Sequence, residues 1–178
     1  MTRPGAQRNG PSFAAIDFET ADAKRDSACA IGIVVVRAQK VAVRYQSLIR
    51  PPRKAFSPFC VGVHGITWGM VRNERSFAEV WAEAEALLCG LDFLVAHNAS
   101  FDNSVLRACC QAAGLPPPEL PFHCTVCTSR ELWRQPHNTL SDVCSLLGIP
   151  LENHHDALCD AEACAHIALN ALQAGWRP

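Results

Sequence analysis

The sequence has 178 residues, of which 49% are apolar and 19% charged, a balance typical of one globular domain and not of bulk disorder. Its formal net charge is −1, so no overall basic field attracts nucleic acid, and such a partner would have to be held locally. No stretch approaches the roughly 18 consecutive apolar residues that a membrane-spanning helix needs.

The first residues carry no targeting pattern. Met1 to Pro11 include Arg3 and Arg8 but no apolar run, which argues against a signal peptide or an anchor. We expect a flexible tail over residues 1–11 and a single domain over residues 12–176. Without an export signal, the ten cysteines are predicted to be reduced thiols, and the protein to be soluble and cytoplasmic.

The first predicted strand carries two carboxylates. Apolar residues from Phe13 to Ile16 lead into Asp17 and Glu19, which share one face of a strand because successive side chains alternate. On its own, an Asp-x-Glu pattern more often marks a strand end and a solvated turn. Two adjacent carboxylates are nevertheless costly unless a cation lies between them, and oxygen ligands favour Mg²⁺ or Mn²⁺.

Two further strands follow at short separation. Residues 29–36 form a nearly unbroken apolar run, in which Gly32 suggests a bulge or a close backbone approach. Residues 41–49 alternate and predict a half-exposed strand, which completes an antiparallel meander. An irregular loop or short helical turn is expected over residues 57–67. A helix over residues 77–88 has the capping-box pattern of Ser76 and Glu79.

The second half of the chain predicts alternating strands and helices. We expect strands over residues 92–96 and 121–126 and helices over residues 128–134, 139–147 and 156–174. Ser100 is predicted to cap a further helix that holds Asp102 in its first turn. Asp156 is predicted to cap the last helix, with Asp160 one turn inside. The fold class is therefore α/β, a mixed five-stranded sheet flanked by helices.

Three segments together resemble the motifs of the DEDDh, or DnaQ-like, 3′-to-5′ exonucleases. They are Asp17-Phe18-Glu19, the segment from His97 to Asp102, and the segment from His155 to Asp160, in this order along the chain. The segment from His64 to Thr67 is similar to the substrate-loop motif of that family, which includes the proofreading epsilon subunit of bacterial DNA polymerase III. The similarity extends from about Phe13 to Ala174.

The resemblance implies a ribonuclease-H-like fold and two Mg²⁺ or Mn²⁺ ions bound by Asp17, Glu19, Asp102 and Asp160. Two such ions clamp the attacking and leaving oxygens of an in-line phosphoryl displacement. His155 is implied as the general base, because an imidazole titrates near neutral pH. The expected reaction hydrolyses phosphodiester bonds from the 3′ ends of single-stranded DNA or RNA and releases nucleoside 5′-monophosphates.

Substrate contacts are also implied by resemblance, at Phe18, Thr20, His64 and Phe101. Phe101 fits the core equally well, and His64 has a loop hydrogen-bonding role as its alternative. His97 and Asn98 are expected to order their loop. His154 is expected to be solvated, and we give it no role.

The match to the family is incomplete at two places. Ala21-Asp22 follows Thr20 where proofreading members continue Thr-Gly, and the chain ends at Pro178 without a counterpart of the polymerase-attachment segment of the epsilon subunit. Asp156 beside His155 would favour the protonated imidazole unless Asp156 is engaged in capping. The sequence leaves open the choice between DNA and RNA and the oligomeric state.

Two other classes of protein compete with an exonuclease. One is a catalytically silent nucleic-acid-binding or scaffolding module on the same fold, against which all five expected catalytic residues argue. The other is a zinc-stabilised interaction domain built on His123, Cys124 and Cys127, with Cys144 as a further ligand. A redox pair at Cys124 and Cys127 is a third option for this pattern. Because a second Cys-x-x-Cys is missing, we expect these thiols to pack in the core.

Overall fold

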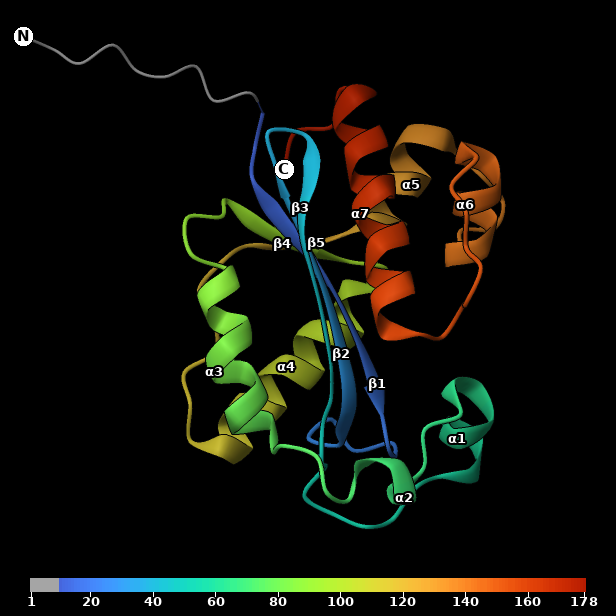
Figure 1. Ribbon diagram of the computed structural model, residues 1–178. Coiled ribbons are helices and arrows are strands. Elements are labelled where there is room, and N and C mark those ends of the chain that lie inside the picture. The colour runs from blue at the N-terminus through green and yellow to red at the C-terminus, as the bar shows by residue number, and fades with distance from the viewer. Residues whose placement is uncertain (1–9) are drawn as a thin grey trace, which may run out of the picture.

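The computed structural model describes residues 10–178 (Figure 1). The flexible tail predicted over residues 1–11 lies outside the described residues, apart from its last two. The predicted domain extent, residues 12–176, stays a prediction. Within residues 10–178, no helix is long and apolar enough to cross a membrane.

A five-stranded mixed sheet forms the centre of the structure. Its strands lie in the order β3-β2-β1-β4-β5. β1 pairs antiparallel with β2, and β2 with β3, whereas β1 and β4, and β4 and β5, are parallel. The strand bounds are β1 Phe13–Thr20, β2 Ala28–Arg37, β3 Lys40–Leu48, β4 Phe93–Ala96 and β5 Phe122–Cys124. The predicted fold class, a ribonuclease-H-like sheet with an antiparallel meander, is confirmed.

Helices cover both faces of the sheet, as Figure 1 shows. The helix bounds are α1 Pro58–His64, α2 Trp68–Val71, α3 Phe77–Leu87, α4 Ala99–Ala113, α5 Thr125–Trp133, α6 Leu140–Leu147 and α7 Ala157–Gln173. α3 and α4 lie on one face, and α7 lies on the other with α5 and α6 outside it. Of the two alternatives expected over residues 57–67, an irregular loop or a short helical turn, the structure has the helical one, α1.

Alternation along β1 separates two cores. Ile16 and Phe18 pack with Trp81 on the α3 and α4 side, whereas Phe13 and Ala15 pack with residues of α7. Because side chains alternate, Asp17 and Glu19 face the α7 side. The sheet therefore presents both carboxylates to α7, the helix that carries Asp160.

One glycine permits this helix to approach the sheet. A Cβ added to Gly32 of β2 would lie 2.1 Å from the carbonyl oxygen of Ala157 and 2.5 Å from the backbone nitrogen of Leu158. Gly32 is the partner of Asp17 in the β1–β2 pairing. The predicted close backbone approach is confirmed, and its neighbour is the N-terminus of α7.

Two predicted boundaries were wrong. α4 begins at Ala99 and is capped by Asn98 in a left-handed conformation with φ 75°, so Ser100 lies inside the helix and its hydroxyl donates to Asn98 Oδ1 at 3.1 Å. Asparagine tolerates this conformation better than most residues, which suits the sharp turn from β4 into α4. β5 is also shorter than predicted, because Thr125 already begins α5.

Candidate active site

Three carboxylates from two elements converge at the C-terminal end of β1. Asp17 and Glu19 of β1 and Asp160 of α7 each offer an oxygen, and these oxygens all lie within 4.8 Å of one another. Asp160 is 5% exposed and stands one helical turn after the N-cap residue Asp156. A cluster of this kind contains only hard oxygen donors, the ligand type that Mg²⁺ and Mn²⁺ prefer.

A fourth carboxylate lies next to β1 on α4. Asp102 is 2% exposed, and its Oδ1 accepts the backbone N–H of Phe18 at 3.1 Å. Its place in the first turn of α4 also suits a negative charge. This hydrogen bond fixes the start of α4 to the residue between Asp17 and Glu19.

The electrostatics of this cluster favour a bound cation. Burial raises the pKa of Asp17 well above its usual range, and the charges of Asp102, Glu19 and Asp160 raise it further. Burial, with the charges of the neighbouring carboxylates, raises the pKa of Glu19 to about 8. Burial raises the pKa of Asp102 to about 7, although the hydrogen bond from the Phe18 N–H lowers it. Because a cation would relieve these costs, the four carboxylates fit a divalent metal site.

Two histidines precede the last helix and contact its carboxylate. The backbone N–H of His155 donates to Asp160 Oδ2 at 3.1 Å, with His155 in a left-handed conformation at φ 72°. The ring of His154 stacks on that of His155 with centroids 3.8 Å apart, and His154 Nδ1 lies 3.0 Å from Asp160 Oδ2. His154 is exposed to solvent, as predicted, but it also contacts Asp160, which was not expected.

Asp156 is engaged in capping, as the predicted arrangement requires. Its Oδ1 accepts the backbone N–H groups of Leu158 and Cys159, at 3.0 and 3.1 Å, and its Oδ2 accepts from Gln46 Nε2 at 2.9 Å. Although burial opposes it, these donors lower the pKa of Asp156. The Asp156 carboxylate is thus held by α7 and β3 beside His155.

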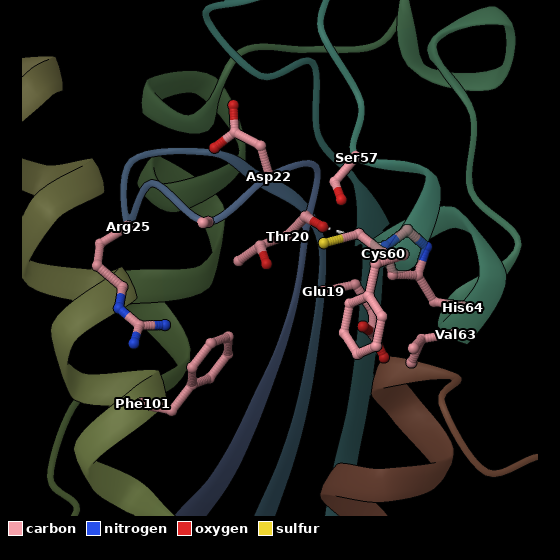
Figure 2. A pocket seen from close by; sticks show the side chains of 11 residues that line it. Glu19, Thr20, Asp22, Arg25, Ser57, Cys60, Val63, His64 and Phe101 are labelled. Carbon is pink, nitrogen blue, oxygen red and sulfur yellow. Dashed lines mark hydrogen bonds between the residues drawn. The ribbon is translucent and has the colours of Figure 1, made fainter.

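A cavity of about 330 Å³ opens beside Glu19, and Figure 2 shows its lining. It lies between β1, the loop that follows β1, the start of α4, and α1. Thr20, His64 and Phe101, all predicted substrate contacts, line it. The other lining residues are Asp22, Ala23, Arg25, Ser57, Phe59, Cys60 and Val63. A hollow of this kind next to a carboxylate cluster offers a place for a substrate group adjoining the metal site.

The comparisons with known proteins agree with this geometry. The family described as "Exonuclease" (RNase_T) matches residues 14–168. The chain belongs to this exonuclease family. The resemblance to DnaQ-like 3′-to-5′ exonucleases is thereby confirmed, and residues 14–168 form an exonuclease domain.

Among its relatives is the DNA polymerase III PolC-type of Thermotoga petrophila, 32% identical over 91% of this chain and 12% of that protein. The 3′-5′ exonuclease DinG of Bacillus subtilis is 31% identical over 93% of this chain and 18% of its own length. The exonuclease chain thus spans less than a fifth of either relative.

Two solved structures share the fold. Exonuclease X in complex with 5′ overhanging duplex DNA has a TM-score of 0.77 and 26% identity, covering 93% of this chain and 94% of that one. The nuclease domain of 3′hExo, a DEDDh family member bound to rAMP, has a TM-score of 0.81 and 20% identity, covering 96% and 94%.

His64 of the exonuclease uses both ring nitrogens within the loop. Its Nδ1 accepts the backbone N–H of Ile66 at 3.0 Å, so its Nε2 carries the proton and donates to the Thr20 carbonyl at 3.1 Å. Burial lowers the pKa of His64, which favours this neutral form. The ring therefore lines the cavity while its nitrogens hold the loop to β1.

Sequence reasoning missed the partner of Phe101. The Arg25 guanidinium lies 4.5 Å from the centroid of the Phe101 ring, and both face the cavity in Figure 2. Phe59, which is 79% exposed on α1, also lines the cavity. Arg25 and Phe101 are 76 positions apart in the numbering, and no periodicity links them.

Other predicted residues have structural partners. The Phe18 side chain is 3% exposed in the core and does not line the cavity, so its prediction as a substrate contact is corrected to a backbone role toward Asp102. His97 orders its loop, as predicted, through Thr125 Oγ1 and the carbonyl of Asn138, both at 3.0 Å. His123 packs edge-on against Phe93 and Trp176. Within residues 10–178, two groups of side chains could hold a metal, Asp17 with Glu19 and Asp160, and His154 with His155 and Asp160, and His123 belongs to neither. Cys124 is half-buried, whereas Cys127 is exposed to solvent, so the prediction that both thiols pack in the core is wrong for Cys127.

Proposed function

We propose that this exonuclease removes nucleotides from the 3′ ends of single-stranded DNA or RNA in a metal-dependent reaction that releases nucleoside 5′-monophosphates. The observation that carries this proposal is the convergence of Asp17, Glu19 and Asp160 within 4.8 Å, beside Asp102 and an open cavity. Exonuclease X was solved with duplex DNA and 3′hExo with rAMP, which supports a nucleic-acid substrate without choosing between DNA and RNA.

Each carboxylate has a defined task in this mechanism. Asp17, Glu19, Asp102 and Asp160 would hold two Mg²⁺ or Mn²⁺ ions through their oxygens. When bound, such ions supply charge stabilisation for the displacement and lower the pKa of the attacking water. The Phe18 N–H holds Asp102 at its place, and the His155 N–H does so for Asp160.

His155 would take the proton of the attacking water. Its backbone N–H donates to Asp160, its ring is stacked on that of His154, and one of its ring nitrogens lies within 4.8 Å of an Asp160 oxygen. The engagement of Asp156 in capping directs its two oxygens to other donors. A base positioned in this way contributes about 10²–10⁴-fold to such reactions.

The cavity would receive the terminal nucleotide. Thr20, His64 and Phe101 line it as the resemblance implies, and the Arg25 guanidinium over Phe101 adds a positive charge at its rim. An aromatic face and a cation together suit a base and its phosphate. We also place the exonuclease in the cytoplasm, where its ten free cysteines would stay reduced.

The test uses 5′-labelled single-stranded DNA, single-stranded RNA and a 3′-recessed duplex, each with Mg²⁺, Mn²⁺ or EDTA. We expect a metal-dependent ladder that shortens from the 3′ end. Asp17→Asn removes a ligand charge and should lower the rate by about 10³-fold or more, because several kcal/mol of charge stabilisation are lost.

The matched control is Glu131→Gln, which neutralises an exposed carboxylate on α5 and should leave the rate unchanged. Binding without cleavage in either metal would instead support a silent nucleic-acid-binding module. Full activity of Asp17→Asn would reject the metal-ligand role of this residue.

A further inference from the structure

Hydrogen bonds brace the loop between β1 and β2. The Ala21 N–H donates to the Ser27 carbonyl at 2.8 Å, and the Ser27 hydroxyl donates to the Lys24 carbonyl at 2.6 Å. From α4, the Cys109 thiol donates to the Arg25 carbonyl at 3.7 Å. The loop therefore holds the backbone of Arg25 at a defined place beside α4.

Another cation occupies the acidic residues on either side of Arg25. Arg53 donates to both oxygens of Asp26, at 2.8 and 2.5 Å, and its Nε lies 3.6 Å from Asp22 Oδ2. Within residues 10–178, Arg25 joins no salt bridge, and its guanidinium lies instead 4.5 Å from the centroid of the Phe101 ring. The charge of Arg25 is therefore left available to an anion from outside the chain.

The Phe101 ring fixes the direction of this guanidinium. Figure 2 shows both side chains on one wall of the cavity beside Glu19, opposite Val63 and His64 of α1. The face of an aromatic ring attracts a cation, and the planar guanidinium group stacks well on it. Because Arg25 covers one face of Phe101, the guanidinium and not that ring face meets a substrate on this side.

Arg25 lies near the carboxylate cluster without joining it. Burial is the main effect on the pKa of Asp102 and raises it, and the positive charge of Arg25 is among the effects that lower it. Glu19 lines the same cavity as Arg25. In the proposed function the metal ions take the scissile phosphate, so a cation on the cavity wall can bind another phosphate. A 3′-terminal nucleotide carries only the scissile phosphate, so this second phosphate belongs to the strand on its 5′ side.

We propose that Arg25 binds the backbone phosphate on the 5′ side of the scissile one, and that Phe101 is a positioning residue that acts through Arg25; this inference rests on the proposed function. A guanidinium binds a phosphate through two parallel N–H donors, and a plane already held in place loses little side-chain entropy. Contacts to the backbone hold a strand without reading its sequence. In a chain with a net charge of −1, Arg25 supplies the local cation that a nucleic-acid substrate requires.

The test compares two short substrates with hydroxyl groups at both ends. A thymidine dinucleotide has only the scissile phosphate, and the trinucleotide has one more; the uridine pair replaces them if the enzyme acts on RNA. In excess Mg²⁺, Arg25→Gln should raise KM about 10-fold for the trinucleotide and less than about 3-fold for the dinucleotide, because one charge-assisted contact is lost. On a longer strand, the salt dependence of log(kcat/KM) should become shallower by about 0.7.

The matched control is Lys24→Gln. It removes a charge from the neighbouring exposed side chain, which does not line the cavity, and should leave KM for both substrates at the wild-type value. Arg25→Lys keeps the charge but lacks the planar fork, so its KM for the trinucleotide should fall between those of the wild type and Arg25→Gln. Thermal unfolding checks that each variant is folded.

A double-mutant cycle tests the role of Phe101. Phe101→Leu keeps apolar bulk but removes the ring face, and should raise KM for the trinucleotide by about 3-fold. Combined with Arg25→Gln, it should raise KM by about 10-fold in total, as Arg25→Gln does alone, because the ring acts through the guanidinium. A total rise of about 30-fold would mean that the two side chains act independently, and would overturn the positioning role of Phe101.

The remaining outcomes separate this inference from the proposed function. Equal rises in KM for both substrates, or a wild-type KM for the trinucleotide in Arg25→Gln, would reject the phosphate contact. A fall in kcat at unchanged KM would also reject it, and would assign Arg25 to the charge balance of Asp102. If the wild type hydrolyses no strand in either metal, the proposed function fails. Fluorescence anisotropy of a labelled ten-nucleotide strand then decides the contact, because Arg25→Gln should bind it about 10-fold more weakly than Lys24→Gln does.

Discussion

Gly32→Ala should damage the active site without touching a carboxylate. The added Cβ would meet the Ala157 carbonyl oxygen at 2.1 Å, and an ordinary contact begins at 3.4 Å, so the start of α7 must retreat by about 1.3 Å. Both neighbours are backbone atoms, so side-chain rotation does not relieve the clash. Asp160, one turn into α7, would move away from Asp17 and Glu19.

The expected cost is measurable in two assays. Overpacking of about 1–3 kcal/mol would lower the melting temperature by about 2–12 °C in a chain of this length. A shift on the order of 1 Å in a metal ligand would reduce kcat by about 10²-fold. Both are obtained from thermal unfolding and from single-turnover hydrolysis in excess Mg²⁺.

Gly62→Ala is the matched control, because nothing lies within 4 Å of the Cβ that it would add in α1. It should unfold at the wild-type temperature or slightly above, and it should retain the wild-type rate. Wild-type stability and kcat in Gly32→Ala would refute the reasoning that this glycine sets the distance between α7 and the sheet.

Three further predictions concern the same site. The pKa of Glu19 is raised to about 8 from its usual 4.5, so the protonated Glu19 side chain stabilises the folded metal-free protein. This contribution to the free energy of unfolding is complete below pH 4.5 and is lost as the pH rises to about 8. Mg²⁺ at about 100 times its Kd adds about 2.7 kcal/mol of stability, or about 5–11 °C in melting temperature. Because Mg²⁺ binds the ionised carboxylates, it should raise the melting temperature more at pH 8 than at pH 6, and an equal shift at both would contradict this. Asp156→Ala should lower the melting temperature by about 2–4 °C through loss of about 1 kcal/mol of capping, whereas Asp156→Asn should unfold near the wild-type temperature. His155→Ala should slow single-turnover hydrolysis by about 10²-fold or more with substrate binding retained, and His154→Ala by less than about 10-fold; equal losses, or rescue of His155→Ala at high pH, would argue against His155 as the base.

The sequence predicted those features that depend on local periodicity. The period-two alternation of β1 placed Asp17 and Glu19 on one face, and Asp156 and Asp160 follow helical spacing, so all four positions could be inferred before the sheet was known. The strand order of the meander followed from short connections.

Contacts between distant segments could not be predicted in this way. His154 and Asp160 are separated by a left-handed turn at His155, so no helical spacing relates them. Asn98 and Ser100 are both good capping residues, and the turn out of β4 decides between them. Arg25 meets Phe101 only because the loop after β1 folds back over the start of α4.

The dependence of the carboxylate cluster on α7 has a consequence for protein synthesis. Asp17 leaves the ribosome before its partner Asp160, which follows 143 positions later, about 7–29 seconds at 5–20 residues per second. Until α7 has docked over Gly32, Asp160 is not in place beside the other three carboxylates, and His155 is not yet held to it. An exonuclease assembled in this order would not cut the nucleic acid around it while it is still being made.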